Sequence, residues 1–279
     1  MERAKLNGIE LEYEVKGSGE PVLLIGPGPF ADSFLPLLTE PALEEYRLVR
    51  YRQRGQAGSP RGPEPVSFAV HAADAAALLR YLRIGRAHVA GHSTGASIAL
   101  QLAADRPDLI DTLVLLEPPL MGVAGAADFL ERIAPALAAF GEGDGAEAMV
   151  RFLTVACSLD RESCRRVVES QIPGGMAQAE GDAHNFFESY LPALGAWSFG
   201  AGEAARLTLP VLFVLGTETD RLFAEGRDLL HAWLPQTEDF TVDGVGHLLH
   251  VQRPGPVARG VAEFLARHPM HLPEMAARR

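Results

Sequence analysis

Residues 87–96 read Ala87-His88-Val89-Ala90-Gly91-His92-Ser93-Thr94-Gly95-Ala96, an apolar run that leads into the pattern G-x-S-x-G and then into a helical pattern. This order predicts a buried strand, a sharp turn and a helix, with the serine at the turn. Such a turn strains the backbone of its serine and presents the hydroxyl above the sheet. Gly91 and Gly95 leave room for the strand and the helix to approach each other. The segment predicts Ser93 as a nucleophile, and the alternative is a serine that only caps the helix.

Apolar runs on both sides of this segment are typical of strands that are buried on both faces. They cover residues 22–25, 48–51, 113–116 and 211–215. Helical patterns separate them at residues 67–82, 93–105, 223–233 and 256–266. An alternating strand precedes these units and follows Asn7-Gly8, a pair that suits a tight hairpin turn. The alternation predicts an α/β fold in which helices flank a mostly parallel central sheet.

The middle of the chain breaks this alternation. Residues 118–206 contain helical patterns and glycine-rich turns and no convincing strand. We therefore expect a core made of residues 1–117 and 207–279, with residues 118–206 inserted as a helical cap. Aromatic side chains of the insertion and two core residues are candidates for a substrate pocket: Phe129, Phe152, Phe186 and Trp197, with Phe30 and His92. The alternative for each cap aromatic is packing between the cap helices.

A serine hydroxyl is a weak nucleophile and needs a general base. His247 is the best candidate, because small residues surround it and it lies between a strand-like run at 240–242 and the last helix. The base in turn needs an acid that holds its tautomer. Glu218 and Asp220 lie in the loop after the strand at 211–215, and the order serine, acid, histidine is that of one class of serine hydrolases.

At this point the chain resembles the α/β-hydrolase family, in its compact esterase- and lactonase-like branch with a helical cap. The resemblance spans residues 9–267 and rests on four motifs: Leu23-Leu24-Ile25-Gly26-Pro27-Gly28, Tyr51-Arg52-Gln53-Arg54-Gly55-Gln56-Ala57-Gly58-Ser59, Gly91 to Gly95, and Gly244-Val245-Gly246-His247. It implies a cofactor-free hydrolase that acts on a small ester, lactone or similar carbonyl compound through an acyl-enzyme. The alternatives are C–C hydrolysis, perhydrolysis or lyase chemistry on the same triad, and a non-catalytic receptor on the same fold.

The chain departs from the family in the loop after the strand at 22–25. Ile25 stands where the family usually has histidine, and Pro27 stands where the family's second oxyanion donor commonly lies. Proline has no N–H to donate. We expect the backbone of Thr94 to be one donor, and Gly28 or Phe30 to replace Pro27 as the other.

Two further departures concern charged residues. Arg52 replaces the usual aspartate before Gln-Arg-Gly, and Thr219 lies where the family usually has its acid. Some relatives take the acid from the end of the preceding strand, where this chain has Glu117. Asp220, Glu117 and Glu218 all remain candidates, and position along the chain favours Asp220.

Composition limits the partners. The formal net charge of −11 argues against nucleic acid and anionic membranes as main partners. The two cysteines form no CxxC pattern, and no metal-ligand cluster is visible, so we expect neither a metal nor a cofactor. The N-terminus leads into no apolar signal region, and no apolar stretch reaches membrane-spanning length. These features predict a soluble cytoplasmic monomer or homodimer whose partner is a small-molecule substrate.

Overall fold

The computed structural model describes residues 1–62 and 65–270 and contains one eight-stranded sheet in the order β1-β2-β4-β3-β5-β6-β7-β8. The strands are β1 (Glu2–Leu6), β2 (Ile9–Lys16), β3 (Pro21–Ile25), β4 (Arg47–Tyr51), β5 (Ala87–His92), β6 (Ile110–Leu116), β7 (Val211–Gly216) and β8 (Thr237–Val242). β2 pairs antiparallel with β1 and β4, and every other neighbouring pair is parallel. The mostly parallel α/β sheet predicted from the apolar runs is confirmed.

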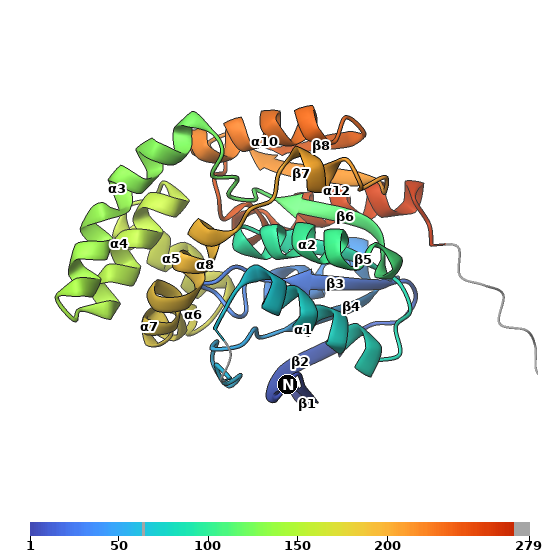
Figure 1. Ribbon diagram of the computed structural model, residues 1–279, viewed down its shortest axis with the longest axis horizontal. Helices are drawn as coiled ribbons and strands as arrows, with labels where there is room; N and C mark the ends of the chain where they lie inside the picture. The colour runs from blue at the N-terminus through green and yellow to red at the C-terminus, as the bar shows by residue number, and fades with distance from the viewer. Residues whose placement is uncertain (63–64, 271–279) are drawn as a thin grey trace, which may run out of the picture.

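The central strands are buried on both faces, as their continuous apolar sequences predict. In β3, Leu23 and Ile25 pack on one face, whereas Val22 and Leu24 pack on the other. The first face carries α1 (Phe68–Tyr81), α2 (Thr94–Asp105) and part of α10 (Arg221–Trp233). The opposite face carries α12 (Pro254–Arg267), labelled in Figure 1, and the short helices η1 (Leu35–Thr39) and η2 (Pro41–Leu43). The sheet is therefore the middle of three layers.

Local sequence explains where these elements begin and end. Asn7 and Gly8 both have positive φ, 47° and 79°, which the tight turn between β1 and β2 requires. The Ser67 hydroxyl accepts the N–H of Val70 at 3.2 Å and so caps α1. Proline stops α2, since Pro107 begins the 3-10 turn η3 (Pro107–Leu109). A last short helix, α11 (Leu249–Gln252), precedes α12.

Between β6 and β7 the described residues 117–210 contain helices and turns and no strand. The helices are α3 (Ala124–Gly141), α4 (Gly145–Cys157), α5 (Arg161–Gln171), α6 (Gly175–Gly181), α7 (Ala183–Asn185), the π-helical turn η4 (Phe186–Tyr190), α8 (Leu191–Ala196) and α9 (Ala201–Ala204). Figure 1 shows α3 to α8 gathered at one end of the sheet. The expected boundaries of the insertion, residues 118 and 206, stay a prediction.

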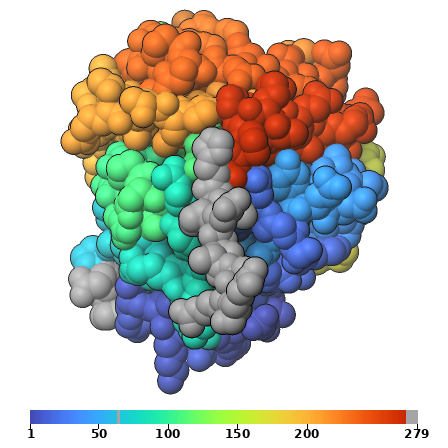
Figure 2. Space-filling model, turned by 90° about the vertical axis from the view of Figure 1, so that its right-hand side faces the viewer, coloured from blue at the N-terminus to red at the C-terminus, as the bar shows by residue number. Residues whose placement is uncertain are grey.

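The end of the molecule away from these helices is seen in Figure 2. The N-terminal hairpin, in blue, lies at the bottom, and the β7–α12 region, in orange and red, lies at the top. This arrangement follows from the strand order, which puts β1 and β8 at the two edges of the sheet. Among the described residues, none of the helices combines the length and the apolar composition that crossing a membrane requires.

Candidate active site

Ser93 lies between β5 and α2 in a strained backbone conformation, with φ 54° and ψ −127°. It occupies the N-cap position of α2, but its side chain makes no capping hydrogen bond. A Cβ atom on Gly95 would lie 2.1 Å from the Ile25 carbonyl oxygen, and one on Gly91 would lie 2.4 Å from the Gly95 oxygen. Only glycine permits this close approach, as expected. Ser93 therefore has a strained backbone but does not cap α2, which argues against the alternative that this serine only caps the helix.

Glu117 lies directly after β6 and holds His247. Its Oε2 atom is 2.7 Å from His247 Nδ1, and its Oε1 atom accepts the N–H of Gly216 at 2.9 Å. Glu117 also has a positive φ, 47°, which strains a residue other than glycine. The Glu117 carboxylate therefore connects the end of β6 with Gly216 at the end of β7 and with His247, which follows β8.

The expectation that Asp220 lies against His247 is wrong. The Asp220 Oδ1 atom caps α10 by accepting the N–H of Leu222 at 2.9 Å, and its Oδ2 atom is 2.5 Å from Arg132 Nη2 of α3. Glu218 is exposed. The physical reason lies in the partners of each carboxylate, because Asp220 is taken up by the N-terminus of α10 and by Arg132, whereas Glu117 is buried between Gly216 and His247.

The His247 ring is fixed from several sides. Phe223 stacks on it with ring centroids 4.0 Å apart and an interplanar angle of 8°, and the His92 ring lies 4.6 Å away. His92 Nε2 donates to the His247 carbonyl oxygen at 2.8 Å. With Nδ1 on Glu117, Nε2 is the nitrogen left for chemistry. Within the described residues no hydrogen bond joins it to Ser93, although both side chains line one cavity; such bonds are often long before substrate binds.

Burial shapes the proton affinities of this pair. Burial, opposed by the hydrogen bond from Gly216, raises the pKa of Glu117 to about 8. Burial lowers the pKa of His247 to about 3, an effect that the nearby charge of Asp220 opposes. Among the described residues, no lysine or arginine hydrogen-bonds to Glu117, and its only partner that can carry a positive charge is His247. Above the pKa of Glu117, an imidazolium formed during a reaction would therefore meet a carboxylate that no other cation neutralises.

An apolar cavity opens above Ser93. It holds about 600 Å³ of space between atoms, counting the part that is open to solvent. The lining comprises Pro27, Pro29, Phe30, His92, Ser93, Thr94, Pro119, Phe129, Phe152, Leu153, Ala156, Cys157, Phe186, Leu191, Leu194, Leu222, Phe223, His247 and Leu248. Ser93, Thr94, His92 and His247 lie outside the segment between β6 and β7. The helices of that segment that line the cavity, α3, α4, η4 and α8, contribute apolar side chains and Cys157.

The cavity includes most of the pocket residues expected from the sequence. Phe30, His92, Phe129, Phe152 and Phe186 all line it. Trp197 does not, and this expectation is wrong: its Nε1 atom donates to Gln101 Oε1 at 2.9 Å, and its ring stacks on Phe199. Trp197 follows α8 with an extended backbone, so its ring packs against the core helices instead of the cavity.

The expected oxyanion donors differ in what they can offer. The Thr94 N–H lies in the first turn of α2, where helix N–H groups have no partner within the helix. Pro27 lines the cavity without an N–H. Gly28 donates its N–H to Thr94 Oγ1 at 2.9 Å, so the expectation that it serves the oxyanion is not met in this structure.

Gln53 and Gln56 belong to the motif at residues 51–59, and the sequence predicts no role for them. Gln53 Nε2 donates to the Gly26 carbonyl at 2.6 Å, and Gln56 Nε2 donates to the carbonyls of Pro27 and Gly28 at 2.8 Å each. Both glutamines are buried. They hold the loop after β3 by its carbonyl oxygens, which the spacing of a single sequence does not reveal.

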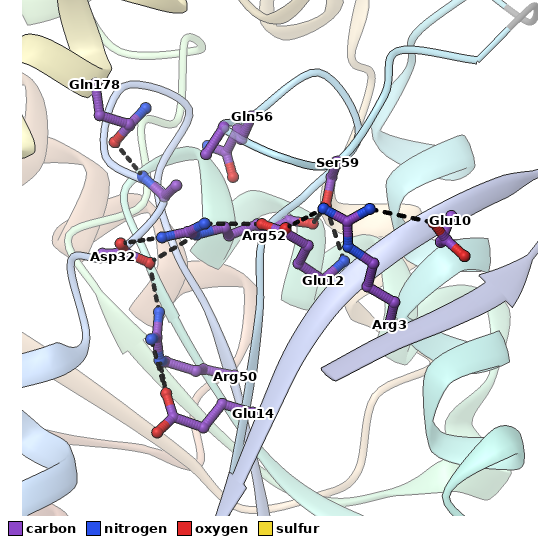
Figure 3. Close-up of polar contacts among 12 residues, drawn as sticks. Arg3, Glu10, Glu12, Glu14, Asp32, Arg50, Arg52, Gln56, Ser59 and Gln178 are labelled. Atoms are coloured by element: carbon purple, nitrogen blue, oxygen red, sulfur yellow. Dashed lines mark hydrogen bonds and ion pairs between the residues drawn. The ribbon is translucent and has the colours of Figure 1, made fainter. Parts of the chain in front are cut away.

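Arg52 stands where the family usually has an aspartate. It holds the loop after β3 at Asp32, on the far side of the segment that the two glutamines bind. Its guanidinium binds Asp32 at 2.6 Å and Glu12 at 2.7 Å, and Arg50 also binds Asp32 (Figure 3). Burial alone would raise the pKa of Asp32, but hydrogen bonds to the two arginines lower it below its usual value. Next to Asp32, the Ala31 N–H donates to Gln178 Oε1 of α6 at 3.0 Å. The loop is therefore attached both to the sheet and to the helices above it.

Residues 21–254 match the family model described as the alpha/beta hydrolase fold. The chain is 30% identical over 253 residues to "Putative carbamate hydrolase RutD" of Enterobacter cloacae, covering 88% of this chain and 92% of that protein. It is 23% identical to "Putative esterase/lipase" of Haemophilus influenzae, covering 88% of this chain and 83% of that protein. The enol-lactonase of Burkholderia xenovorans superposes with a TM-score of 0.76 at 22% identity, covering 95% of this chain and 100% of the other.

Proposed function

The chain belongs to the alpha/beta hydrolase family, and from this premise we propose that it is a serine hydrolase with Ser93 as nucleophile, His247 as general base and Glu117 as the acid. The proposal depends above all on one observation. Ser93, strained and uncapped, shares a cavity with a histidine whose other nitrogen is held by a buried carboxylate at 2.7 Å. Nucleophile, base and orienting acid are the three parts that this chemistry needs.

In the proposed reaction the Ser93 oxygen bonds to the substrate carbonyl carbon while its proton moves to His247 Nε2. The carbonyl π electrons move onto oxygen, and the N–H of Thr94 faces this charge from the start of α2. Glu117 stabilises the imidazolium through Nδ1–H. His247 then protonates the leaving group, and the acyl-enzyme remains. Water, deprotonated by His247, releases the acid and restores Ser93.

The lining of the cavity supports an uncharged acyl group. Apart from Ser93, Thr94 and the two histidines, the lining side chains are apolar or, in Cys157, weakly polar, and the lining contains no lysine, arginine or carboxylate. A charged substrate would lose its hydration there without gaining a partner. We therefore favour small esters and lactones with apolar acyl parts over carboxylate-bearing substrates.

A carbamate is the second candidate substrate. A protein that carries the name of a carbamate hydrolase is 30% identical to this chain over most of both lengths. The same triad would attack the carbonyl carbon of a carbamate. That carbon is bonded to nitrogen where the carbonyl carbon of an ester is bonded to carbon. Parallel assays of a nitrophenyl butyrate and a nitrophenyl N-alkyl carbamate of equal chain length would separate the two substrate classes.

The primary test is the reactivity of Ser93. We expect a fluorophosphonate to modify Ser93 stoichiometrically, as read by peptide mass spectrometry, and to abolish hydrolysis of nitrophenyl butyrate. Ser93→Ala should take no label and should lose activity by about 10⁴-fold or more, because the nucleophile is absent. Ser97→Ala is the matched control, since Ser97 is also buried in α2 and does not line the cavity. Labelling at another residue while Ser93 stays free would contradict the proposal, and a folded, inert wild type would point to a receptor.

A further inference from the structure

The loop after β3 has no free N–H where the family places its second oxyanion donor. Pro27 occupies that position, and Pro29 lies two residues later. The one N–H between them, that of Gly28, is donated to Thr94 Oγ1 at 2.9 Å. The segment Pro27-Gly28-Pro29 therefore offers nothing further to a charge in the cavity, and the next backbone donor along the loop is the N–H of Phe30, which makes no hydrogen bond among the described residues.

The loop is also held in this arrangement. Gln53 and Gln56 bind three of its carbonyl oxygens, those of Gly26, Pro27 and Gly28, at 2.6–2.8 Å. Tyr190 fixes Gln53 in turn, since its hydroxyl donates to Gln53 Oε1 at 3.0 Å. A rotation that turned another N–H of this segment into the cavity would break these buried hydrogen bonds, each costly to leave unmade.

The Thr94 hydroxyl has the properties that the loop lacks. A threonine hydroxyl carries one hydrogen to donate and can accept from others. Its oxygen accepts the Gly28 N–H, which fixes where the oxygen lies and leaves its own hydrogen to point elsewhere. Among the described residues no acceptor takes that hydrogen. Thr94 and Ser93 line the same cavity, in which the charge of a reacting carbonyl would develop.

We infer that Thr94 donates to the oxyanion twice, through its backbone N–H and through its hydroxyl, and that the hydroxyl replaces the N–H that Pro27 removes. This inference rests on the proposed serine hydrolase function. When Ser93 Oγ bonds to the carbonyl carbon and its proton passes to His247, the carbonyl oxygen gains the electron pair of the broken π bond. The Thr94 hydroxyl hydrogen-bonds to that oxygen and keeps its proton throughout, so the step stays balanced.

Thr94→Val tests the hydroxyl, because it keeps the shape of the side chain and the backbone N–H. We expect kcat for nitrophenyl butyrate to fall by about 10²–10³-fold, the usual effect of one lost oxyanion donor, with KM changed little. Thr94→Ser, which keeps the hydroxyl, should stay within about tenfold of the wild type. The extent of fluorophosphonate labelling at Ser93 after exhaustive treatment and the melting temperature show whether each variant is folded.

A second substitution distinguishes hydrogen-bond donation by the Thr94 hydroxyl to the oxyanion from its role in holding the Gly28 N–H of the loop after β3. Pro27→Ala restores an N–H at the family's position but gives the Gly28 N–H no new acceptor. We expect the Pro27→Ala/Thr94→Val double variant to regain at least tenfold in kcat over Thr94→Val, which a purely structural role of Thr94 would not produce. Near-wild-type kcat in Thr94→Val, or equal losses in Thr94→Val and Thr94→Ser with no recovery in the double variant, would overturn the inference. If wild-type Ser93 itself neither labels nor hydrolyses the ester, the proposed function fails instead.

Discussion

The loops after β6 and β7 each present a carboxylate near His247, yet they use it in opposite ways. Glu117 after β6 is wholly buried, and its hydrogen-bonding partners are a backbone N–H and His247. Asp220 after β7 caps α10 and pairs with Arg132. A carboxylate that already has a cation and a helix terminus gains little from an imidazolium, whereas one held without a cation gains much. Surroundings, more than position after a strand, therefore decide which of the two carboxylates is available to a histidine.

The largest effect should come from removing the charge of Glu117. Glu117→Gln keeps the size of the side chain but cannot stabilise an imidazolium, and its amide group can hold His247 in the wrong tautomer. We expect kcat/KM for nitrophenyl butyrate to fall by about 10⁴-fold, the effect known for the equivalent change in a serine protease. Steady-state kinetics near pH 8 measure it. A loss of less than tenfold would remove Glu117 from the triad.

The strand pattern made most of the fold predictable. Apolar runs, the hairpin turn at Asn7-Gly8 and the helix after Ser93 were readable because each depends on residues close in the sequence. His247 was recognisable by its small neighbours and its place before the last helix. The acid was not, because its choice depends on contacts between distant elements, such as the pairing of Asp220 with Arg132 of α3, which forms only in the folded chain.

The same limit explains the errors within the cavity. Nothing local in the sequence indicates that the Gly28 N–H is taken by Thr94, a contact between residues on different elements. Trp197 carries the same signal as the aromatic residues that do line the cavity, an apolar ring in a helical segment. Its direction is set by the extended backbone after α8, where it meets Gln101.

Stability should show the cost of the buried acid. The pKa of Glu117 is raised to about 8 from an ordinary value of 4.5, so its protonated form is the one that suits the fold. A raised folded-state pKa stabilises the protein below the unfolded pKa, and this contribution is lost as pH rises through about 8. Relative to wild type, Glu117→Gln should therefore gain about 3–8 °C in melting temperature between pH 5 and pH 9. A difference that does not change with pH, measured by calorimetry, would contradict the uncompensated burial of Glu117.

The smallest effect should come from the matched change after β7, Asp220→Asn, which also turns a carboxylate into its amide. Asparagine caps helices about as well as aspartate, so the N-terminus of α10 should keep its cap to Leu222. The lost ion pair involves Arg132, whose side chain is 43% exposed, and pairs of this kind contribute about 0–1 kcal/mol to stability.

Asp220 also raises the pKa of His247 against the effect of burial, so its removal makes His247 a weaker base. We expect kcat/KM to stay within about fivefold of the wild type, and the melting temperature within about 3 °C. A loss in Asp220→Asn that equals the loss in Glu117→Gln would mean that the two loops share the acid's role and that the contrast between them is one of geometry alone.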